Sequence, residues 1–312
     1  MRVIFAGTPE TAVPSLTALI ESEHEVIAVI TRPDAPSGRG RALRPSPITV
    51  AADENQIPLL KFGNLRDPAI HEELDRLKPD AIAVVAYGAL IPVDILAKPR
   101  FGWINLHFSL LPSWRGASPV PYAIKFGDEI TGATTFQIDE GLDTGPIYGV
   151  VTERIRPEDT AGTLLARLAV SGAPLLVQTL SGIAGGRLRA LPQGQEDISY
   201  APKISPSEAE IDWRQPALAI ERAIRAYTPA PGAWTTLNGS RIQLGPVSIL
   251  PSTLTGIPGE LIVTKHEVFV TTGSTSIQLG SVRAAGKKEM SAVEWARGVR
   301  VVSGAVFSPS DS

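Results

Sequence analysis

Cysteine is absent from the 312 residues of this chain. The chain therefore forms no disulfide bond, has no thiolate nucleophile and offers no cysteine ligand to zinc or an iron–sulfur cluster. Its four histidines, His24, His71, His107 and His266, follow no metal-ligand spacing, so we expect no metal cofactor. Any catalysis must use oxygen and nitrogen groups.

The sequence also lacks an excess of positive charge and a long apolar run. Its net charge is −3 and its pI is about 5.9, so contact with RNA would need a local basic patch. The apolar part of MRVIFAGTPE is too short for a signal peptide, and no later stretch approaches the length of a membrane span. We therefore expect a cytoplasmic protein without membrane association. Without a coiled-coil pattern or a long edge strand, we expect a monomer.

What the sequence does contain is an alternation of strand and helix patterns in its first half. Strand patterns cover 3–6, 25–30, 80–87, 102–107, 131–139 and 147–155, and helical patterns cover 11–22, 47–55, 68–77 and 160–183. This alternation predicts a Rossmann-like α/β fold with a mostly parallel sheet. The run DAIAVVAY at 80–87 is apolar almost throughout, as is typical of a strand covered on both faces.

The composition changes in the second half. Residues 190–206 are rich in proline and have little apolar periodicity, which predicts an extended linker. After a helical pattern at about 215–227, short strand patterns and turns predict a small, OB-like β-barrel. The chain length and an apolar content of 43% favour two domains. The expected division is an α/β domain over 1–189, a linker, and a barrel domain over 207–312.

Chemistry-bearing residues gather in the stretch NLHFSLLPSWRG, which places Asn105 and His107 two residues apart at the end of a predicted strand. Residues i and i+2 of a strand share a face, and the carboxyl ends of strands in open α/β sheets border the ligand crevice. An amide beside an imidazole can stabilise an oxyanion, and the imidazole can also move a proton. Asp143, in the glycine-flanked loop GLDTGP, is the candidate base or orienting carboxylate.

Residue types alone leave other interpretations open. A histidine near a strand end is often a hydrogen-bonded structural residue, and an aspartate between glycines is often a turn former. Ser109 lies in no G-x-S-x-G motif, so a Ser-His-Asp hydrolase is disfavoured and its hydroxyl is expected to orient the turn. VIFAGTPE has one glycine where a dinucleotide-binding fingerprint needs three, which gives a dehydrogenase little support.

Several motifs together resemble the folate-dependent formyltransferases. The resemblance is carried by FAGTPE, VVAYGALIP, NLHFSLLPSWRGASPV and GLDTG, and it extends over nearly the whole chain. It narrows to the methionyl-tRNA formyltransferases through TRPDAPSGRGR, WRGASP, YAPKISPSEAEIDW and AGKKEMSA. It implies transfer of the formyl group of 10-formyltetrahydrofolate to the amino group of methionine on initiator tRNA, with a catalytic first domain and a tRNA-binding barrel.

The resemblance also implies roles for individual residues. Asn105 and His107 would act at the formyl oxygen, and Asp143 would act at the amine. The residues implied to line the folate site are Tyr87, Gly88, Ala89, Leu90, Ile91, Ser109, Leu110, Leu111 and Pro112. The family commonly has a small residue where this chain has Phe108, whose side chain strand alternation directs away from the catalytic face.

A basic loop over 31–45 is the expected RNA contact. It carries four arginines against Asp34 in an acidic chain, and its proline and glycine content is typical of segments that order on RNA. Charge alone leaves an ordinary solvated loop open, whereas the resemblance implies that this loop enters the tRNA acceptor arm. The expected tRNA-binding residues are Arg32, Arg39, Arg41, Arg44, Lys203, Lys287 and Lys288.

The residues are also compatible with two functions other than formyl transfer to tRNA. A non-catalytic RNA-binding module would explain the basic loop but would give Asn105, His107 and Asp143 no purpose. A formyltransferase of the same fold that acts on an amino sugar nucleotide would use those three residues but would not need the loop.

Overall fold

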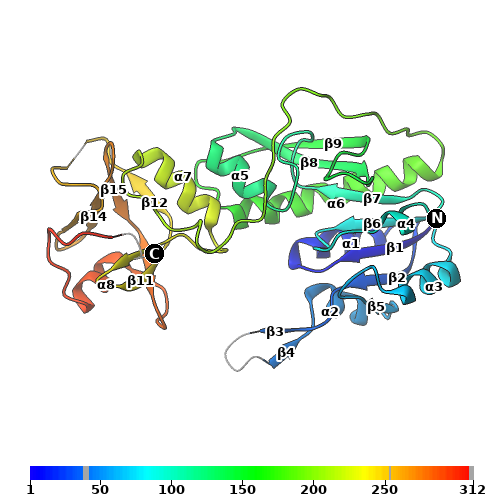
Figure 1. Cartoon of the computed structure of the whole chain (residues 1–312), viewed down its shortest axis with the longest axis horizontal. Coiled ribbons are helices and arrows are strands. Elements are labelled where there is room, and N and C mark those ends of the chain that lie inside the picture. Colours follow the sequence, from blue (N-terminus) through cyan, green and yellow to red (C-terminus); the bar gives the residue numbers. More distant parts are fainter. Residues whose placement is uncertain (38–41, 253, 309–312) are drawn as a thin grey trace. The chain divides into compact units, whose positions relative to one another are not determined.

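The computed structural model describes residues 1–37, 42–252 and 254–308, which form two compact units (Figure 1). Unit 1 comprises Met1–Pro119, Ile130–Arg154 and Leu165–Pro202, and unit 2 comprises Val120–Glu129, Ile155–Leu164 and Lys203–Ser312. Two short segments of the range 1–189, Val120–Glu129 and Ile155–Leu164, therefore group with unit 2, which no local sequence pattern indicates.

Unit 1 is built on a seven-stranded sheet in the order β5-β2-β1-β6-β7-β8-β9. The strands are β1 (Arg2–Gly7), β2 (Glu25–Thr31), β5 (Leu59–Lys61), β6 (Ala81–Val85), β7 (Trp103–His107), β8 (Ile130–Gln137) and β9 (Ile147–Arg154). The first five in this order pair in parallel, and β8 and β9 add antiparallel pairs. The predicted Rossmann-like, mostly parallel sheet is confirmed.

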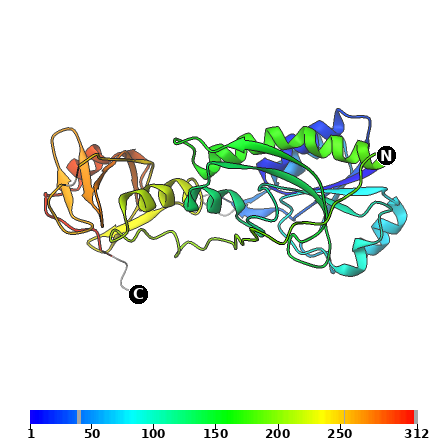
Figure 2. The ribbon, with the colours of Figure 1, turned by 90° about the horizontal axis from the view of Figure 1, so that it is seen from above.

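Helices cover both faces of this sheet, with α1 and α6 on one face and α3 and α4 on the other (Figures 1 and 2). The helices described up to residue 184 are η1 (Glu10–Ala12), α1 (Val13–Ile20), α2 (Pro47–Glu54), α3 (Pro68–Leu77), α4 (Val93–Leu96), α5 (Pro119–Phe126) and α6 (Ala161–Ala184). Proline at the first position follows a capping side chain in α2 (Ser46) and α3 (Asp67), so both helix starts are encoded locally. The sequence patterns missed α4, α5 and β5.

The core lies between these layers. Every residue of β6 is buried, in agreement with its apolar pattern. Alternate residues of β1 serve the two faces, and Ile4 packs in a cluster with Ile70 of α3 and Ile95 of α4. The long helix α6 packs on the opposite face, where a Cβ on Gly172 would lie 3.1 Å from the side chain of Leu106.

The expectation that no stretch approaches a membrane span was wrong for α6. By length and composition alone, this helix could cross a membrane. However, its Leu168, Leu176 and Leu180 are buried in the protein core, and the Thr179 hydroxyl lies 2.8 Å from that of Thr135 in β8. A core helix passes the same composition test, so the pattern carries no membrane assignment.

Unit 2 contains two four-stranded antiparallel sheets, in the orders β10-β11-β16-β17 and β12-β15-β14-β13. Its elements are α7 (Ala217–Tyr227), β10 (Trp234–Leu237), β11 (Ser240–Leu244), β12 (Val247–Ile249), β13 (Leu261–Val263), β14 (Val268–Thr271), β15 (Ser276–Leu279), β16 (Ser281–Ala284), β17 (Met290–Ser291) and α8 (Ala292–Gly298). A further two-stranded ladder, β3 (Ala35–Ser37) with β4 (Ala42–Arg44), belongs to unit 1.

The two sheets of unit 2 are joined at corners. The chain leaves one sheet and enters the other between β11 and β12 and again, at Gly280, between β15 and β16. A Cβ on Gly280 would lie 2.7 Å from the carbonyl oxygen of Pro246, so a glycine suits this close approach. Strands that switch sheets at such bends produce barrel-like packing, which agrees with the predicted small β-barrel.

Candidate active site

The carboxyl ends of β1, β6 and β7 lie side by side at one edge of the unit 1 sheet. Strand β1 pairs with β2 on one side and with β6 on the other, so the strand order reverses between β1 and β6. The hydroxyl of Thr8, just after β1, donates to the carbonyl oxygen of Tyr87, just after β6, at 3.0 Å. Ligands of open α/β sheets bind at such a reversal, so this edge is the candidate site.

Asn105 and His107 belong to β7, the next strand along. In the antiparallel ladder with β8, Asn105 is opposite Phe136 and His107 is opposite Thr134. Their spacing of two residues puts both side chains on one face of the sheet. Asn105 is half-buried, whereas His107 is 6% exposed and lies against the edge of the Phe136 ring. The imidazole is therefore held by packing as well as by hydrogen bonds.

The tautomer of His107 follows from its partners. Its Nε2 lies 2.9 Å from the carbonyl oxygen of Trp114, which can only accept, so Nε2 carries a hydrogen. Its Nδ1 faces Asp143, with 3.7 Å between Nδ1 and Oδ2. Burial lowers the pKa of His107 below its ordinary value, although the Asp143 carboxylate and the Trp114 carbonyl act in the opposite direction. A neutral ring in this arrangement presents a lone pair on Nδ1.

Asp143 is held in an unusual backbone conformation. Its φ is +52°, in the left-handed region that aspartate visits more readily than most residues. Its Oδ2 accepts a hydrogen bond of 2.7 Å from the backbone N–H of Gly116. The following loop passes so close to β8 that a Cβ on Gly145 would lie 1.7 Å from the carbonyl oxygen of Gln137. The glycine at 145 is thus required by this close approach.

The turn after β7 is organised by hydroxyl groups. The Ser109 hydroxyl, in a fully buried residue, donates to the carbonyl oxygen of Ser113 at 2.6 Å. The Thr134 hydroxyl donates to the carbonyl oxygen of Ser109 and accepts from the N–H of Leu111. Ser109 therefore orients the turn, as interpreted from the sequence, and its hydroxyl has a partner within the protein. Phe108 is buried.

Residues 1–180 match the family model described as formyl transferase, and residues 203–300 match the model described as formyl transferase, C-terminal domain. The chain belongs to the formyl transferase family. A methionyl-tRNA formyltransferase from Nocardioides sp. is 56% identical over 306 residues, which cover 97% of each chain. Another, from Thermobifida fusca, is 56% identical over 307 residues, covering 98% of this chain and 99% of that protein.

The fold of this chain is also similar to that of a solved structure. HypX from Aquifex aeolicus, determined in complex with tetrahydrofolic acid, aligns with a TM-score of 0.65 at 20% identity. The alignment covers 95% of this chain and 47% of HypX, so this formyl transferase spans about half the length of that protein.

The segment predicted to line the folate site of this formyl transferase follows β6. The Tyr87 ring is turned into the core, where its hydroxyl donates to the carbonyl oxygen of Phe62 and burial raises the pKa of Tyr87 to about 12. The Tyr87 ring is therefore held in the core, and the Tyr87 carbonyl oxygen accepts from Thr8. Leu90 is 81% exposed. Of the two residues before it, Gly88 is exposed and Ala89 is half-buried. After β7, Leu110 and Pro112 are half-buried and Leu111 is buried.

The predicted RNA-binding residues of the formyl transferase are in part described. Arg32 and Arg44 are exposed, and Arg32 donates through Nη1 to the carbonyl oxygen of Gly88 at 2.9 Å. Arg32 thus links the basic loop to the segment predicted to bind folate. Arg39 and Arg41 lie outside the described residues.

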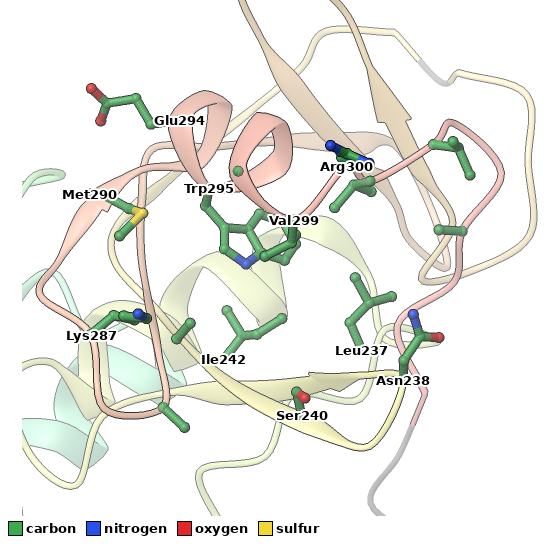
Figure 3. Close-up of a pocket in the computed structure, with 16 residues that line it drawn as sticks. Leu237, Asn238, Ser240, Ile242, Lys287, Met290, Glu294, Trp295, Val299 and Arg300 are labelled. Carbon is green, nitrogen blue, oxygen red and sulfur yellow. The ribbon is translucent and has the colours of Figure 1, made fainter.

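In unit 2, Lys203, Lys287 and Lys288 are all exposed, and the last two share the turn between β16 and β17. Lys287 stands at the margin of a cavity of about 600 Å³ whose interior side chains include Leu237, Ile242 and Trp295 (Figure 3). The cavity lies within unit 2 and shares no residue with the site at the sheet edge.

Two further residues of the site are not evident from the sequence. Arg115 and Gln193 are 6% and 8% exposed, and the Arg115 guanidinium donates to the side-chain oxygen of Gln193. Arg115 stands within the WRGASP motif, but Gln193 falls in the segment predicted to be a linker, and its own surroundings in the sequence give no sign of burial. Within the described part of the chain, no group of three histidine or acidic side chains is arranged to hold a metal ion.

Proposed function

We propose that this formyl transferase moves the formyl group of 10-formyltetrahydrofolate to the α-amino group of methionine on initiator tRNA, forming N-formylmethionyl-tRNA. The observation that carries the proposal is the 56% identity, over 97% of both chains, to a methionyl-tRNA formyltransferase. A match to the family models in both halves of the chain supports a shared two-domain organisation.

The reaction forms one carbon–nitrogen bond and breaks another. The amine nitrogen of methionine attacks the formyl carbon, the bond to the folate nitrogen breaks, and the amine loses a proton. Negative charge develops on the formyl oxygen during attack. The half-buried Asn105 side chain, at the carboxyl end of β7, supplies an amide N–H donor to that oxygen.

His107 and Asp143 serve the transfer of the proton that the amine loses. Because Nε2 of His107 donates to the Trp114 carbonyl, Nδ1 is the ring nitrogen that is free to exchange a proton with the reacting groups. Asp143 lies 3.7 Å from that nitrogen and stabilises the ring once it is protonated. We therefore assign the amine proton to His107, whereas the resemblance implied that His107 acts at the formyl oxygen. With its Nε2 hydrogen bonded to the Trp114 carbonyl, the neutral ring has no free N–H to donate to that oxygen.

The surface after β6 and β7 suits a folate substrate. A pterin ring needs an apolar slot with hydrogen-bonding groups at its edge. Leu90 and Ile91 provide exposed and half-buried apolar surface, and the exposed Gly88, with φ of +81°, brings bare backbone to the same segment. Pro112 supports the slot from the next strand end.

A transfer assay tests the proposal. The full chain is given 10-formyltetrahydrofolate labelled in the formyl group, with methionyl initiator tRNA, methionyl elongator tRNA or an amino sugar nucleotide as the acceptor. Label on the initiator tRNA is the expected result. Label confined to the sugar would overturn the RNA part of the proposal, and no transfer to any acceptor would overturn the whole of it.

A further inference from the structure

One glutamine amide joins two loops of the candidate active site. The Arg115 guanidinium donates to Oε1 of Gln193 through Nε, at 3.2 Å, and through Nη2, at 2.6 Å. Nε2 of Gln193 donates to the carbonyl oxygens of Asp143 and Gly145, each at 2.8 Å. A side-chain amide has two donor hydrogens and two acceptor lone pairs, so all four are used.

These contacts also determine which way the amide points. A guanidinium only donates and a backbone carbonyl only accepts, so Oε1 must face Arg115 and Nε2 must face the loop of Asp143. Both Arg115 and Gln193 are more than nine-tenths buried. A buried network of this kind loses much of its strength when one member is removed, because the others keep unpaired polar groups.

The loop of Arg115 is anchored on its other side as well. The N–H of Arg115 donates to the carbonyl oxygen of Ser199 at 2.9 Å, and the N–H of Ala201 donates to the carbonyl oxygen of Arg115 at 2.7 Å. The next residue, Gly116, holds the Asp143 carboxylate. The segment predicted to be a linker is therefore hydrogen-bonded along the turn after β7.

Within the described residues, the loop of Asp143 has internal hydrogen bonds through Asp139, which accepts from the Gly141 N–H at 3.0 Å and from the Thr144 hydroxyl at 2.7 Å. Gly141 and Gly145 flank Asp143 at a distance of two residues, and Asp143 itself occupies the left-handed region. Glycine permits many backbone conformations, so contacts at the Asp143 and Gly145 side add to those of Asp139 in holding the observed one. Gln193 supplies two of them, at the carbonyl of Asp143 itself and at the second glycine.

We propose that Gln193 is a positioning residue for the transfer reaction: it ties the Asp143 loop to buried Arg115 and so keeps the Asp143 carboxylate opposite Nδ1 of His107. The inference rests on the proposed function, because it assigns Gln193 an effect only through Asp143. It gives Gln193, a single buried residue of the segment predicted to be a linker, an effect on catalysis.

The substitution Gln193→Glu separates the two halves of the network. A glutamate keeps an oxygen acceptor for Arg115, but it replaces the two N–H donors by an oxygen that repels the carbonyls of Asp143 and Gly145. We expect kcat for transfer to methionyl initiator tRNA to fall by about 10- to 100-fold, with the KM for the folate little changed, because small misplacements of a catalytic group have effects of this size. Gln195→Glu is the matched control, since Gln195 is exposed in the same segment and acquires the same charge; its kcat is expected to stay at the parent value.

A second comparison asks whether the effect passes through Asp143. If it does, Gln193→Glu combined with Asp143→Asn is no slower than Asp143→Asn alone, because the position of a side chain that can no longer act does not matter. Effects that multiply in the double variant, or a parent-like kcat in Gln193→Glu, would overturn the inference. Thermal unfolding confirms that each variant is folded.

If Gln193→Glu does not fold, Gln193→Asn keeps the amide and its neutrality but lacks the length to reach both loops, and the same fall in kcat is expected. The failure of the proposed function has a different signature, because the parent chain itself would then transfer no formyl group to methionyl initiator tRNA. A parent-like kcat in Asp143→Asn would overturn the assigned role of Asp143, whereas a slow Asp143→Asn with a parent-like Gln193→Glu would overturn only the role of Gln193.

Discussion

Each residue of the candidate trio depends on a different structural device. Asn105 is oriented by the pleat of β7, and His107 by the hydrogen bond from its Nε2 to a backbone carbonyl. Asp143 is oriented by its own left-handed backbone conformation in a loop that contains glycines. They meet because the N–H of Gly116, in the turn after β7, holds the Asp143 carboxylate, whose Oδ2 lies 3.7 Å from Nδ1 of His107. In the proposed mechanism, Nδ1 is the ring nitrogen that exchanges a proton.

Replacing the carboxylate of Asp143 tests this arrangement directly. In Asp143→Asn the oxygen of the side-chain amide can still accept from the Gly116 N–H, so the loop is expected to keep its conformation. The variant cannot stabilise a protonated His107, and we expect kcat to fall by about 10²- to 10⁴-fold, the usual range for general acid–base groups. Single-turnover transfer with methionyl initiator tRNA measures the loss, and an unchanged thermal unfolding midpoint shows that the fold persists.

The lowered pKa of His107 predicts a neutral imidazole near pH 7, which is the active form in the proposed mechanism. The acceptor amine, with an ordinary pKa of about 7.7 to 8.0, must be neutral as well, so the acid limb of kcat reports both groups. The pKa of His107 is therefore measured directly, from the pH dependence of its imidazole NMR signal in the free protein. Burial places this pKa below the ordinary value of 6.5, and in Asp143→Asn removal of the carboxylate that raises it lowers it further. A pKa above 6.5 in the parent chain would contradict the neutral-ring assignment.

At the scale of elements, the ladder of β3 and β4 carries Arg44, one of the residues predicted to bind tRNA. Asp34, just before β3, pairs with Lys61 of β5 at 2.8 Å, and Arg44, which is opposite Ala35 in the ladder, is exposed. The sequence indicated the charge of this segment but not its strands.

Arg44→Ala tests whether this ladder contacts RNA. Removing one lysine or arginine from a phosphate reduces the slope of log affinity against log salt by about one unit. We expect weaker binding of methionyl initiator tRNA and a slope that is shallower by about one unit. Arg66→Ala, at an exposed arginine elsewhere in unit 1, is the control and should keep the parent slope. An unchanged slope in Arg44→Ala would exclude a phosphate contact by this residue.

Elements with strong local patterns were predicted well. The helix over 68–77 was predicted with the bounds of α3, and the predicted strand over 25–30 lies within β2. Helix α8 was missed although Ser291 and Glu294 form a capping box at its start, a pattern readable in the sequence. Strand β5, with three residues, was missed because so short a segment shows no periodicity.

At the scale of the whole molecule, buried histidines link stability to pH. His24 is 6% exposed, and its Nε2 lies 3.1 Å from the hydroxyl of Ser181 in α6. Burial, followed by the nearby terminal amino group, lowers the pKa of His24, although Glu23 acts in the opposite direction. The pKa of His107 is lowered too. The folded state therefore binds fewer protons than the unfolded state below pH 6.5.

Stability should accordingly rise with pH in this window and fall on acidification. Both histidines must lose favourable burial when they are protonated, so the free energy of unfolding decreases as the pH drops from about 6.5 toward their folded-state pKa values. Urea unfolding over this range measures the slope. His24→Gln, which cannot titrate, should give a shallower slope, and a slope equal to that of the parent chain would show that His24 carries none of the linkage.

By itself, the sequence determined the features that depend on neighbours along the chain. Period-two alternation put Asn105 and His107 on one face of a strand, and apolar runs identified the sheet. Only the tertiary structure decided which groups meet across long separations: that the Trp114 carbonyl takes the hydrogen of His107, that Asp143 faces Nδ1, and that Gln193 reaches back to Arg115. The physical reason is that hydrogen bonds depend on positions within a few tenths of an ångström, and those positions are set by the packing of distant segments rather than by local preference.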